Sequence, residues 1–115
     1  YRFATELKEP ILQRAKTATI RYEDERNPKP RDVIIAVDQD DSIFAVLVVK
    51  RVHDLPICEI DEYLGEEDIR YGASNSWEVL SQLYTHYPDE FEAIDRWTDV
   101  RLLVFQRLVA GGTDE

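Results

Sequence analysis

The chain has 115 residues, 43% of them hydrophobic, and its 24 acidic against 14 basic residues give a net charge of −10 at pH 7. This length and apolar content predict one folded domain with a single core, and they exclude an intrinsically disordered chain. The longest apolar run, 43–49, is too short for a membrane helix, and the first residues contain no secretory signal, so we expect a cytoplasmic protein without membrane contact.

Charge is unevenly distributed along the chain. Residues 1–31 carry eight basic and five acidic side chains, a balance of +3, whereas 32–115 carry six basic and nineteen acidic ones, a balance of −13. The net charge therefore does not argue against an anionic partner near the N-terminal part. Arginine outnumbers lysine by ten to four, which together with the acidic excess suggests a salt-adapted proteome. Salt weakens the attraction between cationic side chains and phosphate. At high salt, hydrogen bonding and stacking would therefore have to contribute more to the binding of an anionic partner.

Hydrophobic periodicity and turn residues predict an α+β fold. In the first half of the chain, the patterns predict a strand over 3–7, a short helix from residue 9, and strands over 17–22, 33–38 and, long and central, 43–52. In the second half, they predict a partly helical acidic segment over 55–68, a helix ending near 87, an amphipathic turn over 91–97 and a closing strand over 99–108. We expect a single domain over 1–115, with its core in about 3–108 and a frayed tail over 109–115.

The helix that ends near residue 87 has the clearest boundaries. Asn75 followed by Glu78 has the form of an N-terminal capping box, and Pro88 ends the helix. His86 is expected on the helix surface. The apolar side chains at helical spacing are expected in the core: Trp77, Leu80, Leu83, Tyr84 and Tyr87.

Polar side chains alternate along the strand that begins at Thr17. Thr17, Thr19 and Arg21 share one face, Ala18 and Ile20 the other, and Lys16 precedes them at the start of the strand. A row of hydroxyl and cationic donors suits an anionic or carbonyl-rich ligand. An ordinary exposed strand face is the alternative, because threonine is a good strand former and arginine is usually solvated.

The stretch Lys16-Thr17-Ala18-Thr19-Ile20-Arg21, with the apolar pair Ile11-Leu12 and a polar spacer before it, resembles the opening signature of the ASCH superfamily. The resemblance extends over roughly 3–108. It implies a small PUA-like β-barrel with flanking helices that cover a ligand cleft. It also implies an association with RNA and modified nucleosides.

The first functional interpretation is therefore RNA or nucleotide binding. In this interpretation Lys16 and Arg21 contact a phosphate or a base edge, and Thr17 and Thr19 supply hydroxyl groups. An aromatic side chain stacks on an unpaired base, with Tyr22, Tyr71 and Trp97 as candidates. The expected partner is RNA or a modified nucleoside.

The alternative interpretation is catalytic. The resemblance points to small amidohydrolases that convert N4-acetylcytidine to cytidine and acetate with a lysine, a threonine and a glutamate, and the first two match Lys16 and Thr19. The glutamate position falls near residues 72–73, which carry no carboxylate. Glu66, Glu67 or Asp68 could replace it if the intervening loop is displaced. A third role, protein interaction, would use the acidic surface.

No pattern in the sequence indicates a metal or a cofactor. His53 and Cys58 have no second ligand pair at zinc spacing, and the acidic turn over 39–42 lacks the rest of a calcium loop. The chain also contains no glycine-rich phosphate loop and no Ser/His/Asp order typical of a hydrolase triad. We therefore expect no metal and no cofactor.

Overall fold

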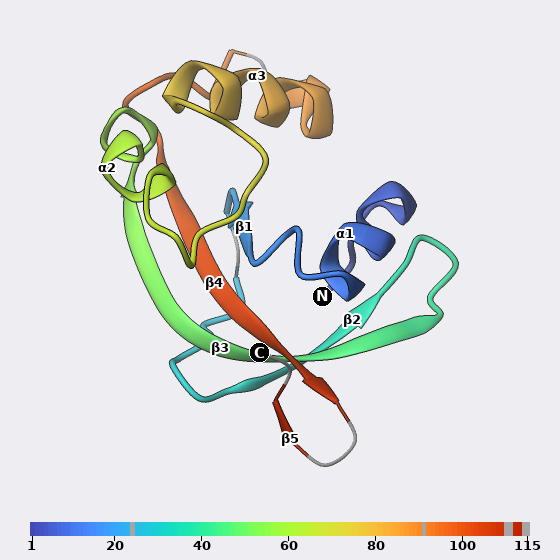
Figure 1. The fold of residues 1–115 in the computed structure, drawn as a ribbon. Coiled ribbons are helices and arrows are strands. Elements are labelled where there is room, and N and C mark those ends of the chain that lie inside the picture. Colours follow the sequence, from blue (N-terminus) through green and yellow to red (C-terminus); the bar gives the residue numbers. More distant parts are fainter. Residues whose placement is uncertain (24, 91, 110–111, 114–115) are drawn as a thin grey trace.

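The computed structural model describes residues 1–23, 25–90, 92–109 and 112–113. Its centre is one antiparallel sheet with the strand order β1 (Ala18–Arg21), β4 (Asp99–Val109), β3 (Ile43–Pro56) and β2 (Val33–Val37), and β5 (Gly112–Thr113) pairs with β4. The long strands β3 and β4 curl together into a half-barrel (Figure 1). This is the α+β arrangement with a central 43–52 strand that the sequence predicts.

Short helices surround the sheet. They are the 3₁₀ turns η1 (Thr5–Leu7), η2 (Ile57–Glu59) and η3 (Pro88–Glu90) and the α-helices α1 (Lys8–Leu12), α2 (Asp61–Leu64) and α3 (Ser76–His86). At the start of α3, the Asn75 side chain accepts a hydrogen bond of 3.0 Å from the Glu78 amide, which confirms the predicted cap. Among the described residues, no helix has the length and apolar character needed to cross a membrane.

Buried side chains form two clusters, one on each face of the sheet. Because side chains alternate along β4, Leu102 belongs to one cluster and Leu103 to the other. The first cluster lies under α2 and α3 and includes Leu83, whereas the second lies under the N-terminal residues and α1 and includes Ile11. The sequence predicts a single core, but cover on both faces of the sheet divides the buried residues into two groups.

A β-bulge changes which alternate side chains of β3 enter each cluster. Val49 pairs with Phe105 and Arg51 pairs with Val104, so Lys50 is the extra residue. Before the bulge, odd-numbered residues such as Val49 lie in the cluster under α1, and after it Leu55 lies in the cluster under α2 and α3. The strand is also longer than predicted, since it continues to Pro56.

The predicted first strand over 3–7 is wrong. The Phe3 amide donates to the Val37 carbonyl (2.9 Å), and Arg2 and Val37 form an isolated bridge, but Thr5–Leu7 is a 3₁₀ turn that leads into α1. The chain leaves the edge of β2 after one bridge and has no further partner for strand pairing. Phe3 is nevertheless in the core, as predicted, and is 4% exposed.

Trp77, a predicted core side chain, is exposed, and so are Val33 and Ile35 of the predicted strand over 33–38 and Trp97 of the predicted amphipathic turn. Val33 and Ile35 lie on the outer face of the edge strand β2, where burial alternates, although the β-branched sequence reads as a buried strand. Trp77 and Trp97 are 64% and 68% exposed, and both contact the guanidinium of Arg96, with the Cζ atom 5.8 and 4.9 Å from the ring centres. The residues that α3 does bury, among them Leu83, lie on its other side.

The structure describes part of the predicted frayed tail over 109–115. Val109 belongs to β4, and Gly112–Thr113 pair with it as β5. The remaining positions of that prediction, 110–111 and 114–115, lie outside the described residues, as does Phe91 of the predicted amphipathic turn. Ile94 of that turn is 1% exposed, as its spacing indicates.

Candidate functional site

A cleft of about 390 Å³ opens beside β1, between the N-terminal segment and α3. We call it the signature cleft, because Lys16, Thr19 and Arg21 line it together with Tyr71. The N-terminal segment adds Phe3 and Glu6, and α3 adds Gln82 and His86. Four of the predicted site residues therefore meet in one place, although Tyr71 is distant from the other three in sequence.

Lys16 is buried at the inner wall of the signature cleft, with 6% of its surface exposed. Its Nζ donates a hydrogen bond of 3.2 Å to the Tyr71 carbonyl and lies 4.4 Å from the centre of the Tyr71 ring. Burial, and secondarily the charge of Arg21, lower the pKa of Lys16 from 10.5 to about 7. Near neutral pH both forms of the amine are accessible, so Lys16 can either donate a proton or accept one.

Arg21 is the second cation of the cleft, and its contacts fix its position. Its Nη2 donates to the Arg2 carbonyl (2.9 Å), and its Cζ atom lies 4.9 Å from the ring centres of both Tyr1 and Phe3. Packing on two aromatic rings holds the guanidinium in place while its charge continues to act on the cleft. Thr19, two residues earlier on the same face, is 6% exposed and offers a hydroxyl group.

Tyr71 supplies an aromatic surface. Burial raises the pKa of its phenol to about 12, so the side chain stays protonated and uncharged at physiological pH. The next residue, Gly72, has φ +99°, a conformation that side-chain-bearing residues rarely adopt, and its carbonyl accepts a hydrogen bond of 3.1 Å from Gln82. This bond ties the Tyr71 loop to α3 across the cleft.

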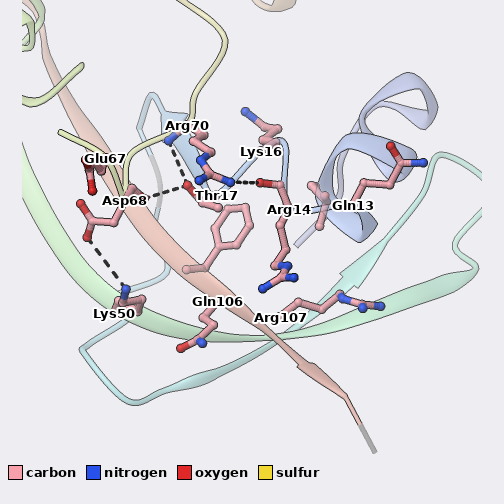
Figure 2. A pocket seen from close by; sticks show the side chains of 12 residues that line it. Gln13, Arg14, Lys16, Thr17, Lys50, Glu67, Asp68, Arg70, Gln106 and Arg107 are labelled. Carbon is pink, nitrogen blue, oxygen red and sulfur yellow. Dashed lines mark hydrogen bonds and ion pairs between the residues drawn. The ribbon is translucent and has the colours of Figure 1, made fainter. Parts of the chain in front are cut away.

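A second pocket, of about 430 Å³, lies next to the signature cleft (Figure 2). We call it the basic pocket, since four cationic side chains line it besides Lys16: Arg14, Lys50, Arg70 and Arg107. Phe105 also lines it, and Lys16 is the one residue that lines both pockets. Thr17, predicted as a ligand contact in the same cleft as Thr19, lines the basic pocket instead.

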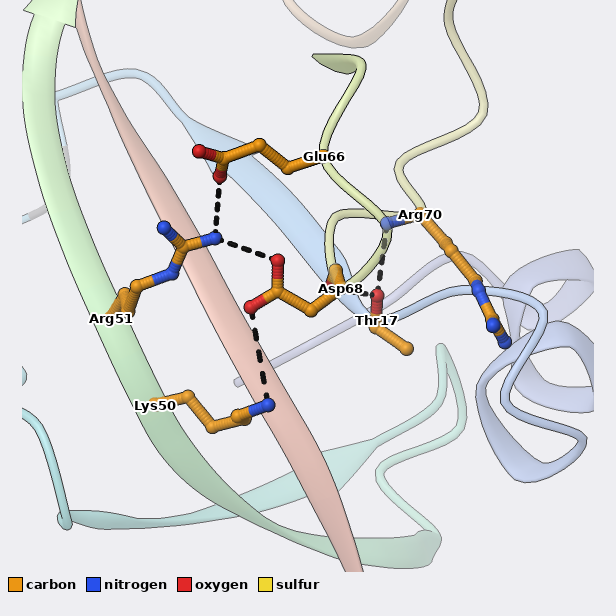
Figure 3. Close-up of polar contacts among 6 residues, drawn as sticks. All are labelled: Thr17, Lys50, Arg51, Glu66, Asp68 and Arg70. Atoms are coloured by element: carbon orange, nitrogen blue, oxygen red, sulfur yellow. Dashed lines mark hydrogen bonds and ion pairs between the residues drawn. The ribbon is translucent and has the colours of Figure 1, made fainter. Parts of the chain in front are cut away.

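The wall of the basic pocket is the loop over 66–70, which several polar contacts fix (Figure 3). The Thr17 hydroxyl donates to the Asp68 carbonyl (2.7 Å) and accepts from the Arg70 amide (2.9 Å). Arg51 Nη2 donates to the carboxylates of Glu66 (2.7 Å) and Asp68 (2.8 Å), and Lys50 Nζ lies 3.9 Å from Asp68. Thr17 therefore has a structural task that its place in the signature does not reveal.

None of the three carboxylates that the sequence offers for catalysis, Glu66, Glu67 and Asp68, lines the signature cleft. Glu66 is held by Arg51, and Glu67 lines the basic pocket. Glu6 is the carboxylate that lines the signature cleft, and nothing in the pattern of the sequence distinguishes it from other surface acids. Gln82 and His86 are also new, although their i, i+4 spacing on one helix face could have been noticed.

The other predicted aromatic contacts lie elsewhere. Tyr22 packs edge-on against Tyr87, with ring centres 5.6 Å apart, and Trp97 stacks with Arg96 away from both pockets. Within the described part of the chain, no three His, Cys, Asp or Glu side chains are grouped in a way that could hold a metal ion.

No family model matches the sequence, and none of the curated proteins matches it. Solved structures do match. Protein EF3133 from Enterococcus faecalis V583, described with the family model DUF984, has a TM-score of 0.69 and 16% identity, with 95% of this chain and 72% of that chain covered. An ASCH domain from Lactobacillus crispatus JV V101 has a TM-score of 0.67 and 13% identity, with 89% and 70% covered. The fold is ASCH-like.

Hypothetical protein PH0355 shares this ASCH-like fold at a TM-score of 0.65 and 21% identity, with 93% of this chain and 95% of that chain covered. The PUA-like architecture that the Lys16–Arg21 signature implies is thereby confirmed at the level of the fold. At these identities the likeness extends to the fold alone, so the role of the signature cleft has to be argued from its chemistry.

Proposed function

We propose that this protein binds the base of a nucleotide or of single-stranded RNA in the signature cleft. The observation that carries the proposal is the convergence of Lys16, Thr19, Arg21 and Tyr71 on one cleft of about 390 Å³. This volume falls in the range of small-molecule sites, and the lining combines an aromatic ring with a few fixed polar groups, which is the usual composition of such sites.

The chemistry of the cleft suits a heteroaromatic base with carbonyl and amine edges. Lys16 and Thr19 can each donate or accept a hydrogen bond, and Arg21 can only donate. Tyr71 and His86 provide ring surfaces against which a base can stack. A cytoplasmic location, where RNA and nucleotides are abundant, is part of this proposal.

Binding of cytidine and of a short cytidine-containing RNA to Lys16→Met and Thr19→Val tests the proposal. We expect affinity to fall about tenfold or more for each variant, because each leaves a buried polar partner of the base unpaired. Lys29→Met and Thr85→Val are matched controls on exposed residues outside the cleft and should bind like the unmodified protein. Equal affinity of all four variants would refute base binding in this cleft.

Hydrolysis of an N4-acylated cytidine is a second candidate, favoured by the pKa of about 7 that Lys16 has in the cleft it shares with Thr19. The neutral amine would take the proton of the Thr19 hydroxyl as its oxygen attacks the amide carbonyl, and an acyl-threonine would form as cytidine leaves. Water would then release acetate from Thr19. A carboxylate would orient Lys16 or pass the proton to the leaving amine.

Release of cytidine from N4-acetylcytidine, followed by chromatography, tests this second candidate. Lys16→Ala and Thr19→Val should abolish release. The variants Glu6→Gln, Glu66→Gln and Glu67→Gln identify the carboxylate, and the loss should be confined to one of them. Absence of release from the unmodified protein under conditions where it binds cytidine would reject the enzyme and keep the binding function.

A further inference from the structure

The basic pocket concentrates positive charge on a strongly acidic protein. The whole chain carries −10, yet Arg14, Lys50, Arg70 and Arg107 line this one pocket of about 430 Å³. Two carboxylates also line it, but that of Asp68 faces Arg51 (2.8 Å) and Lys50 (3.9 Å) (Figures 2 and 3). The cationic side chains of the lining outnumber its two carboxylates, so the electrostatic potential of the pocket favours an anion.

The cations of the basic pocket come from four separate segments, so the fold brings them together. Arg14 follows α1 with a left-handed backbone, φ 60°, and its carbonyl accepts a hydrogen bond of 2.9 Å from Arg70. Arg107 lies on β4 two residues after Phe105, and therefore on the same side of that strand. Lys50 is the extra residue of the bulge in β3. Each side chain thus has a defined origin on the wall of the pocket.

The basic pocket and the signature cleft are neighbours along one face of the β1 strand. In the register of β1 and β4, Ala18 pairs with Val104 and Thr19 with Leu103. One residue earlier, the Thr17 carbonyl accepts a hydrogen bond of 2.9 Å from the Phe105 amide. Thr17 therefore shares a face with Thr19, but it lines the basic pocket whereas Thr19 lines the cleft. A two-residue step on a strand is about 7 Å. Lys16, which lines both pockets, marks their border.

We infer that the basic pocket binds a phosphate group of the ligand whose base enters the signature cleft. This inference rests on the proposed function and narrows it: the ligand is a nucleotide or an RNA strand, not a free nucleoside. Guanidinium groups suit phosphate because each offers several hydrogen-bond donors in a planar fork. Three of them, those of Arg14, Arg70 and Arg107, line this pocket. The short separation of the two pockets fits a base and a phosphate of one chain.

Three probes of increasing phosphate content test the inference: cytidine, cytidine 5′-monophosphate and a cytidine hexanucleotide RNA, each titrated at low salt. We expect a phosphate-bearing probe to bind about tenfold tighter than cytidine, an advantage that added salt reduces. Arg107→Gln should remove most of this advantage and leave cytidine binding unchanged. Arg31→Gln is the matched control, since Arg31 is exposed and lines neither pocket. Arg70→Gln serves as a second variant if Arg107→Gln fails to fold.

The outcomes separate the inference from the proposed function. If only the hexanucleotide binds more tightly than cytidine, the phosphate in the basic pocket belongs to a neighbouring nucleotide. If the monophosphate binds as tightly as the hexanucleotide, the phosphate belongs to the nucleotide whose base is bound. Either outcome supports the inference, provided that Arg107→Gln removes the gain in affinity. Binding of cytidine with no gain from phosphate overturns the inference and leaves base recognition intact. Binding of phosphate-bearing probes, dependent on Arg107 but without cytidine binding, supports the pocket and refutes base recognition. A phosphate advantage that Arg107→Gln and Arg70→Gln both leave intact overturns the inference.

Discussion

Thr17 and Arg70 are joined by two hydrogen bonds: the Thr17 amide donates to the Arg70 carbonyl (2.9 Å), and the Arg70 amide donates to the Thr17 hydroxyl (2.9 Å). These two bonds join the loop over 66–70 to the residue that precedes β1. Thr17 and Arg70 both line the basic pocket, and the next residue, Tyr71, lines the signature cleft.

Replacement of Thr17 by valine should destabilise the protein by about 1–3 kcal/mol, because the carbonyl of Asp68 and the amide of Arg70 lose their hydroxyl partner in a part-buried site. Valine keeps the shape and the strand preference. Urea denaturation measures the change, and hydrogen exchange should accelerate at Arg70. Thr85→Val, whose hydroxyl bonds Ser81 on the exposed side of α3, should change stability by less than half as much.

Lys16 makes stability depend on pH in a defined window. Its pKa is about 7 in the folded protein against 10.5 in the unfolded chain, so between these values the unfolded chain binds more protons. The free energy of unfolding should therefore rise with pH from about 7 to 10.5, by at most about 1.4 kcal/mol per pH unit. Below pH 7 the cost of burying the charged amine is fully present.

Urea denaturation of Lys16→Met across this pH range isolates the effect. The stability difference between the unmodified protein and the variant should grow in favour of the unmodified protein as the pH rises, because methionine cannot titrate. Lys29→Met, on an exposed residue, should show no such trend. A pH-independent difference for Lys16→Met would contradict a lowered pKa.

The cap of α3 should contribute measurably to stability. Asn75→Ala removes the side chain that accepts a hydrogen bond of 3.0 Å from the Glu78 amide. This loss should lower the free energy of unfolding by about 1 kcal/mol. Since α3 contributes Gln82 and His86 to the signature cleft, ligand affinity should fall as well. Asn27→Ala, in an exposed loop, is the matched control. Unchanged stability and unchanged affinity of Asn75→Ala would contradict this prediction and would mean that water replaces the side chain as partner of the Glu78 amide at no cost.

Trp77 and Trp97 should behave as surface residues. With 64% and 68% of their surfaces exposed, both should fluoresce at long wavelength and be quenched by acrylamide in the folded protein. Trp77→Ala should cost less than about 1 kcal/mol, whereas Leu83→Ala, at a position 1% exposed on the same helix, should cost about 2–5 kcal/mol. A blue-shifted, unquenched emission would indicate that the two indoles are buried.

Local signals predict the central elements of this fold well. The boundaries of α3, β2 and β4 follow from Asn75, Pro88 and runs of β-branched residues, because capping, proline geometry and strand preference act within a few residues. The prediction of a first strand over 3–7 is wrong because strand pairing needs a partner that the local sequence does not encode. The predicted burial of Trp77 is wrong for a similar reason. Helical spacing identifies a row of apolar side chains, but the position of the helix on the sheet determines which of them are buried.

The candidate site shows the same division. The alternation of the signature strand places Thr19 and Arg21 on one face, and both line the cleft together with Tyr71 and with Lys16, which precedes the strand. The sequence could not reveal that Thr17 bonds to Asp68, 51 residues away, nor that Glu6 and His86 line one cleft from segments far apart in the chain. Long-range placement depends on the whole sheet, and a linear pattern does not contain it.

The bulge at Lys50 has a consequence for how this chain tolerates changes in length. Loops such as 25–31 can gain or lose residues at the surface, and deletion of Lys50 would likewise leave Val49 opposite Phe105 and Arg51 opposite Val104, in unbroken pairing between β3 and β4. Because Arg51 already lies opposite Val104, the side chains from Arg51 to Pro56 would keep their faces: Leu55 would stay in the cluster under α3, and Arg51 would stay beside Glu66 and Asp68. Loss of a residue elsewhere in β3 would shift the pairing and turn part of the strand over. Position 50 is thus a place inside a strand where the chain can change length without rearranging the core.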